Sequence, residues 1–132
     1  MIMYLLLDLS RTGIIHLSLF DQTERKEAEY PGQNRELLEK LVAFLQENRL
    51  TVSELSGLSV VVGTGGFTST RLTAVVANLI GFQKQLPLLA VPADRIHDYD
   101  WQVKEFVRQI PGQLISPTYS GQPNITQKKK AR

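Results

Sequence analysis

Cysteine is absent from the 132 residues of this sequence, and histidine occurs only twice, as His16 and His97. The lack of cysteine excludes disulfide bonds, thiolate metal sites and cysteine nucleophiles, and the wide separation of the two histidines along the chain argues against a histidine metal cluster. No apolar run approaches the roughly 20 residues that a membrane-spanning helix needs. Residues 1–7 also lack the basic front and the cleavage site of a signal peptide. We therefore expect a soluble cytoplasmic protein with no metal ion, no other cofactor and no contact with a membrane.

Positive charge is scarce outside the end of the chain. The formal charge is +2, from 15 basic and 13 acidic residues, but Lys128, Lys129, Lys130 and Arg132 supply four of the positive charges. Without them, 11 basic residues face 13 acidic ones, so the basic balance belongs to a tail and does not indicate a basic face for nucleic acid. For residues 116–132 we expect an extended or disordered tail, the alternative being contact with RNA or another partner.

The length suits one domain, and the apolar pattern predicts an α/β fold. A continuous apolar run over residues 1–8 is typical of a strand in the middle of a sheet, and residues 13–20 predict a second strand antiparallel to it. Residues 26–30 alternate weakly and carry charges, as an edge strand does. Two further apolar runs, residues 58–62 and 87–91, lie on either side of a predicted helix. We therefore expect a five-stranded mixed sheet, with a three-stranded antiparallel meander plus two parallel strands, covered by helices.

Helical spacing of apolar residues predicts three helices, over residues 35–48 after a cap at Asn34, over residues 68–85 after a cap at Thr68, and over residues 99–110. A short strand is expected at residues 114–115. The first two helices have more apolar surface than contact with one sheet can bury, which predicts an interface with another chain. The candidate interface residues are Leu38, Leu41, Val42, Leu45, Thr73, Val76, Ala77 and Ile80.

A glycine loop, made by Gly63, Gly65 and Gly66, lies between the fourth predicted strand and the second helix. Free amides and the helix dipole at such a loop favour an anion, and Thr68 and Arg71 could complete the site. The loop has no P-loop lysine and does not fit the dinucleotide fingerprint. We favour a structural interpretation, in which the glycines permit positive φ and a tight reversal into the helix, and keep anion binding as the alternative.

Acidic residues provide two other candidate sites. Asp8 ends the first strand, where it could either hold a nucleotide together with the glycine loop or cap the hairpin turn through an Asx-type hydrogen bond, and we favour the cap. Asp94, Asp98 and Asp100 surround His97, but they lie in a proline-bounded loop without matching ligands elsewhere. We interpret them as solvated loop and helix-capping residues, and we expect no catalytic residue.

The order of these motifs resembles the TsaB family. The family has a strand followed by Gly-Pro-Gly-Ser-Phe-Thr-Gly-Leu-Arg at the start of a helix, and residues 63–71, Gly-Thr-Gly-Gly-Phe-Thr-Ser-Thr-Arg, keep five of these nine positions. The family's Asp-Thr-Ser after the first strand is matched by Asp8 and Ser10, with Leu9 in place of threonine. The strand at residues 86–91 is also similar. The likeness covers residues 1 to about 92 and implies an RNase H-like, actin-like lobe there.

The chain departs from the family after this lobe, where the family has a second domain of similar fold. We expect residues 1–92 to form the RNase H-like lobe and residues 93–115 to be a remnant of the second lobe, with a helix packed on the first. Residues 116–132 are then the basic tail.

The resemblance also implies a function. TsaB is a non-catalytic accessory subunit of the bacterial machinery that makes threonylcarbamoyladenosine in tRNA, an inactive relative of the catalytic subunit TsaD, with which it pairs through the two helices of its first lobe. We therefore expect an accessory subunit that forms a heterodimer with a TsaD-like protein, or a homodimer through the same helices, and that associates with tRNA only indirectly. The alternative is a small nucleotide-binding or ATPase-like domain that uses Asp8 and the glycine loop.

Overall fold

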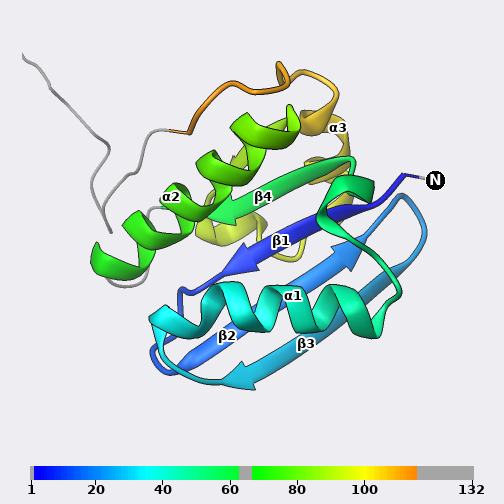
Figure 1. The fold of residues 1–132 in the computed structure, drawn as a ribbon. Coiled ribbons are helices and arrows are strands. Elements are labelled where there is room, and N and C mark those ends of the chain that lie inside the picture. The colour runs from blue at the N-terminus through cyan, green and yellow to red at the C-terminus, as the bar shows by residue number, and fades with distance from the viewer. Residues whose placement is uncertain (1, 63–66, 116–132) are drawn as a thin grey trace, which may run out of the picture.

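The computed structural model describes residues 2–62 and 67–115, with only the backbone of residue 67, and these ranges form one five-stranded sheet (Figure 1). The strands are β1 (Tyr4–Asp8), β2 (Ile14–Phe20), β3 (Arg25–Pro31), β4 (Gly57–Val61) and β5 (Leu88–Val91). Their order across the sheet is β3-β2-β1-β4-β5. The first three strands form an antiparallel meander, and β4 and β5 run parallel to β1. The predicted mixed sheet of an RNase H-like lobe is confirmed, with β1 in the middle.

Three helices accompany the sheet, namely α1 (Leu37–Glu47), α2 (Phe67–Lys84) and α3 (Tyr99–Phe106). Short 3-10 turns are formed by Asn34–Glu36, Val52–Glu54 and Ala93–Arg95. The third helix was predicted to continue to residue 110, which is wrong. Beyond Phe106 the amides of Arg108 and Gln109 donate to carbonyls three residues back, so the chain leaves the helix in turns before Pro111.

The predicted strand at residues 114–115 is also wrong. The backbone of Ile115 is held by one side chain instead of a strand, because its amide donates to Asn78 Oδ1 at 2.7 Å and its carbonyl accepts from Asn78 Nδ2 at 2.9 Å. This arrangement places the segment that follows α3 along α2.

The start of α1 differs from the predicted cap at Asn34. The amide of Gln33 donates to Glu36 Oε2 at 2.7 Å, and a 3-10 turn then leads into the helix. The Asn34 side chain accepts a hydrogen bond from the hydroxyl of Ser69 at 3.2 Å. Asn34 therefore connects the beginnings of α1 and α2.

The two faces of the sheet bury different residues, because side chains alternate along each strand. Helices α1 and α2 cover one face, over a core that includes Leu5, Leu7, Leu17, Leu58, Val60, Leu41, Leu45 and Ala77. Helix α3 covers the other face, over Tyr4, Leu6, Phe20, Val61, Leu89 and Val91. Since β1 contributes to both cores, its continuous apolar run is explained.

Helix α3 is held to its face by close packing and by two polar contacts. A Cβ atom on Gly57 of β4 would lie 2.7 Å from the Phe106 ring, so only glycine lets α3 come this near to the strand. Ser18 of β2 donates to the hydroxyl of Tyr99 at 3.0 Å, and Ser59 of β4 donates to Gln102 Oε1 at 3.1 Å. The Gln102 amide donates in turn to the carbonyls of residues 95 and 96, so this buried side chain is fully engaged.

Helix α2 approaches the sheet as closely on the opposite face. A Cβ atom on Gly81 would lie 2.7 Å from the methyl carbons of Leu88 on β5. Glycine is less favourable than alanine inside a helix, but Gly81 allows a close contact with Leu88 that a larger residue would prevent. Within the described ranges, no helix combines the length and the hydrophobicity needed to cross a bilayer.

Candidate functional site

The side of α2 that points away from the sheet carries three exposed apolar side chains. Val75, Leu79 and Phe82 are 52%, 66% and 65% exposed, and we call these three residues the α2 face. The side that touches the sheet has mostly small residues, Thr70, Thr73, Ala74, Ala77 and Gly81. Exposed aromatic and branched apolar residues at a spacing of four and three form a stripe along one side of a helix, which is the usual form of a helix contact.

Helix α1 exposes a smaller apolar surface on the same side of the sheet. Leu38 and Val42 lie one turn apart and are 55% and 41% exposed, and we call them the α1 pair. The neighbouring positions Leu37, Leu41 and Leu45 are buried against the sheet.

The predicted interface residues therefore divide into three groups. Leu38 and Val42 are exposed, and Val76 and Ile80 are partly buried against the core. The other four, Leu41, Leu45, Thr73 and Ala77, are buried beneath the helices, so the expectation that these side chains meet a partner is wrong. On α1 the buried side is the one that carries Phe44, and on α2 it is the one with small residues.

The exposed residues that were missed are Val75, Leu79 and Phe82. Their spacing was visible in the sequence, but α2 is apolar on all sides, and the small residues that mark its buried side were not weighed.

A shallow hollow of about 310 Å³ lies beside the α2 face. It is lined by Asn78, Leu79, Phe82 and Leu114, the last from the segment that follows α3. The amide of Gly112 donates to the carbonyl of residue 86 at 3.0 Å, which together with Asn78 holds this segment against α2. The hollow is almost wholly apolar and is therefore suited to an apolar side chain from another molecule.

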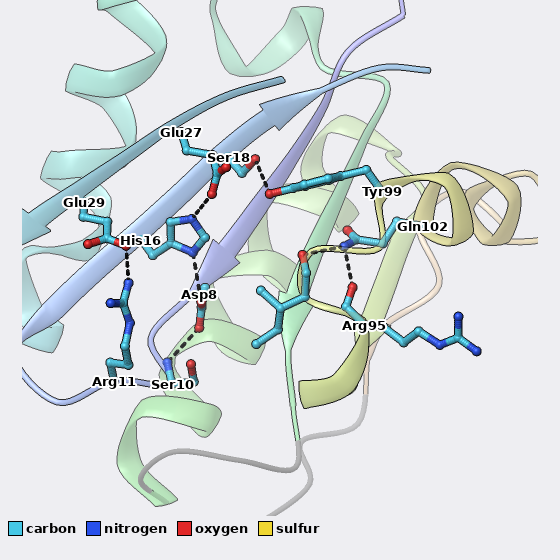
Figure 2. Close-up of polar contacts among 11 residues, drawn as sticks. Asp8, Ser10, Arg11, His16, Ser18, Glu27, Glu29, Arg95, Tyr99 and Gln102 are labelled. Carbon is cyan, nitrogen blue, oxygen red and sulfur yellow. Dashed lines mark hydrogen bonds and ion pairs between the residues drawn. The ribbon is translucent and has the colours of Figure 1, made fainter. Parts of the chain in front are cut away.

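On the other face of the sheet, one polar chain of contacts crosses three neighbouring strands (Figure 2). His16 of β2 lies between Asp8 of β1, at 2.9 Å from Nδ1 to Oδ2, and Glu27 of β3, at 2.8 Å from Nε2 to Oε1. We call these residues the Asp8–His16–Glu27 bridge. His16 and Asp8 are buried, whereas Glu27 reaches them from the exposed edge strand.

The bridge requires a doubly protonated imidazole. Ionised carboxylates only accept hydrogen bonds, so both ring nitrogens of His16 must donate. Burial alone would lower the pKa of His16, but the hydrogen bonds to Asp8 and Glu27 and their charges outweigh it and raise that pKa. Burial alone would raise the pKa of Asp8, but the hydrogen bonds from His16 and Ser10 outweigh it and lower that pKa. An imidazolium with both protons bound has no lone pair to accept a proton from a serine, so the bridge is not arranged as a general base.

Asp8 also forms the hairpin cap that its position predicts. The amide of Ser10 donates to Asp8 Oδ1 at 2.9 Å, while Oδ2 faces His16, so both carboxylate oxygens are engaged. The Asx-type interpretation is confirmed.

Next to the bridge is a small crevice of about 280 Å³. It is lined by Asp8, Ser10, Arg11, His16, Glu29, Ile96 and His97. The two histidines have ring centroids 6.1 Å apart, although they are distant in the sequence and no local pattern indicates that they meet. Among residues 2–62 and 67–115, no three His, Asp or Glu side chains are grouped as metal ligands would be.

The remaining predicted site residues are placed as follows. Gly63, Gly65 and Gly66 lie outside the described residues, and Thr68 and Arg71 are exposed in the first turns of α2. Because α2 already includes Phe67, the predicted cap at Thr68 is wrong. The Asp98 carboxylate caps α3 by accepting from the Trp101 amide at 3.1 Å, so the capping interpretation is confirmed for this residue.

Comparison with known proteins places this geometry in context. No family model matches the sequence, and no curated protein was found to be similar to it. Solved structures do match, and among them are YeaZ from Pseudomonas aeruginosa and an uncharacterized protein with similarity to peptidase YeaZ from Pseudomonas aeruginosa. Each is 25% identical, with a TM-score of 0.62, and the match covers 70% of this chain and 44% of the other. The chain thus spans less than half the length of these neighbours. YeaZ belongs to the TsaB family, so this likeness confirms the resemblance to that family.

Proposed function

We propose that this chain is a non-catalytic accessory subunit that pairs with a TsaD-like catalytic subunit in the formation of threonylcarbamoyladenosine in tRNA. The observation that carries the proposal is the α2 face, Val75, Leu79 and Phe82, which is exposed in the isolated chain. The role is indirect, because the chain stabilises and positions its partner and supplies no reacting group of its own.

The amount and kind of exposed surface support a protein partner. A soluble monomer rarely exposes more than a few hundred Å² of contiguous apolar surface, whereas a stable interface covers about 800 Å² on each partner. The α2 face, the hollow beside it and the α1 pair all lie on the side of the sheet that α1 and α2 cover. Phe82 is an exposed aromatic residue, a type that is enriched in interfaces, and Leu79 lies one turn away from it.

The chemistry at Asp8 favours this proposal over the nucleotide-binding alternative. A nucleotide site of the expected kind needs the Asp8 carboxylate for the ligand, but its two oxygens are engaged by Ser10 and His16. Detaching His16 would leave buried charges without partners, which is costly.

The test is a pair of substitutions. Leu79→Asp places a charge at the centre of the exposed α2 face, and Gln22→Asp places the same charge on an exposed polar residue beside α3, on the other face of the sheet. Binding of each variant to the TsaD-like protein of the same cell is measured by titration calorimetry, with circular dichroism to show that the helices are intact. We expect Leu79→Asp to weaken binding at least about tenfold, equivalent to about 1.4 kcal/mol, while Gln22→Asp binds as the unsubstituted chain does.

Two outcomes contradict the proposal. One is equal binding of Leu79→Asp and the unsubstituted chain, and the other is a chain that self-associates through the α2 face and has no affinity for the TsaD-like protein. Leu41→Asp is not a suitable test, because Leu41 is buried and its substitution is expected to unfold the lobe.

A further inference from the structure

We propose that the Asp8–His16–Glu27 bridge is a protonation-dependent contact. It holds the edge strand β3 to the centre of the sheet while both ring nitrogens of His16 are protonated, and it breaks when one proton is lost. The inference is independent of the proposed partner. It stands on the geometry of the bridge, in which two hydrogen bonds of 2.9 Å and 2.8 Å connect β1, β2 and β3 in succession.

Strand β3 depends on such a tie because it buries little. Among the strands that the structure describes, it is the last at one edge of the sheet and pairs with β2 alone. Of its side chains only Ala28 and Tyr30 are partly buried, and the others are exposed. Apolar burial therefore holds β3 weakly, and a charged contact to the buried core adds a comparatively large share of its stability.

The bridge responds to one proton because its partners cannot donate. A neutral imidazole has one N–H group, so a lone pair of the other ring nitrogen would face either Asp8 or Glu27. That contact is repulsive, and it would leave a carboxylate without its donor. Glu27 lies on the exposed edge strand, whereas Asp8 is buried in the central strand, so separation of Glu27 and β3 from His16 is the change that disturbs the core least.

The charged and titratable groups around His16 come from several elements of the fold. They are Asp8 on β1, Glu27, Glu29 and Arg25 on β3, Arg11 in the first hairpin turn, His97 before α3 and Tyr99 on α3. Arg11 pairs with Glu29, and the Arg25 guanidinium lies 4.4 Å from the centre of the Tyr99 ring, so these cations already have acidic or aromatic partners. The pKa of His16 is raised. The Asp8–His16–Glu27 bridge is therefore intact at and below the ordinary pKa of histidine, and it breaks as the pH rises above the raised pKa of His16.

Amide substitutions test the mechanism without removing the contacts. Glu27→Gln allows the side-chain NH₂ to donate to the His16 Nε2 lone pair, so a neutral ring with its proton on Nδ1 satisfies both partners. Glu29→Gln is the matched control, because Glu29 is on the same strand and pairs with Arg11 instead of His16. Hydrogen exchange of the β3 amides is measured in the full chain on both sides of the His16 titration, as protection relative to the intrinsic exchange rate, and the His16 ring is followed by nitrogen-15 NMR.

In the unsubstituted chain and in Glu29→Gln we expect protection of β3 to fall by about tenfold as His16 loses its proton, while α1 keeps its protection. In Glu27→Gln the fall is absent and the His16 pKa is lower. The inference is refuted if NMR shows His16 with a single ring proton near neutral pH, if β3 protection is the same on both sides of the titration, or if Glu27→Gln and Glu29→Gln lose protection alike at every pH.

Discussion

Replacement of Gly57 by alanine tests the packing of α3, the helix that closes the second face of the sheet. The added Cβ would lie 2.7 Å and 2.8 Å from two carbons of the Phe106 ring and 2.9 Å from a carbon of the Tyr4 ring. Carbon atoms in favourable contact are about 3.5–4.0 Å apart, so the overlap is about 1 Å. Both rings are buried and stacked on each other with centroids 4.3 Å apart, and neither can swing into solvent to relieve it.

The size of the effect follows from two opposing contributions. Overpacking of this kind costs about 1–3 kcal/mol, while replacing glycine in a strand by alanine recovers about 0.5–1 kcal/mol. We expect Gly57→Ala to lower the free energy of unfolding by about 1–2 kcal/mol. For a domain of this size that corresponds to a fall in Tm of about 4–8 °C.

Urea unfolding followed by far-UV circular dichroism measures the loss, and a double variant shows its cause. Phe106→Leu removes part of the ring that the new Cβ strikes. The double variant Gly57→Ala with Phe106→Leu is therefore expected to lose about 1 kcal/mol less free energy of unfolding than the sum of the losses of the two single variants. A Gly57→Ala chain as stable as the unsubstituted one, or strictly additive losses, would refute the close approach of α3 to β4.

Three further predictions concern polar groups. Stability is expected to be highest at intermediate pH. The raised pKa of His16 adds stability that is lost as the pH rises through that pKa, and the lowered pKa of Asp8 adds stability that is lost as the pH falls through that pKa. Midpoints of urea unfolding across the pH range measure both losses. Gln102→Leu leaves three hydrogen-bonding partners unpaired, the buried Ser59 hydroxyl and two partly buried carbonyls, and is expected to cost about 3 kcal/mol by the same unfolding assay. Asp98→Ala removes the α3 cap and is expected to cost about 1 kcal/mol in thermal unfolding, whereas Asp94→Ala, exposed and outside the cap, changes little.

The architecture was predictable because each strand leaves a local pattern. The uninterrupted apolar run of β1 indicated a strand buried on both faces, and the charges of β3 indicated an edge, as the strand order confirms. Helix ends were less predictable. The α1 start depends on a hydrogen bond from Gln33 to Glu36, and the end of α3 depends on turns formed beyond Phe106, neither of which the apolar spacing records.

The Asp8–His16–Glu27 bridge could not be predicted from local pattern. Its three residues belong to three strands, and they meet only because the register places Asp8 opposite His16 and brings β3 alongside on the same face. A histidine in an apolar strand is ordinary in sequence. The proximity of His16 and Asp8 follows only from the register of the predicted hairpin, which places both side chains on the same face. That register cannot be assigned from the local pattern alone.

The orientation of α2 was the main error, and its physical reason bears on where the chain binds. In a helix with apolar residues all round, hydrophobicity does not say which side faces the sheet, so side-chain size decides instead. The close contact of Gly81 with Leu88 and the burial of Ala77 show that the small side goes inward, because it lets the helix approach the strands. The large residues Leu79 and Phe82 are then left outside, although each would gain most from burial. A helix that leaves two large apolar residues exposed is stable only if close packing with the sheet compensates, and its exposed side gains the missing burial when another chain covers it.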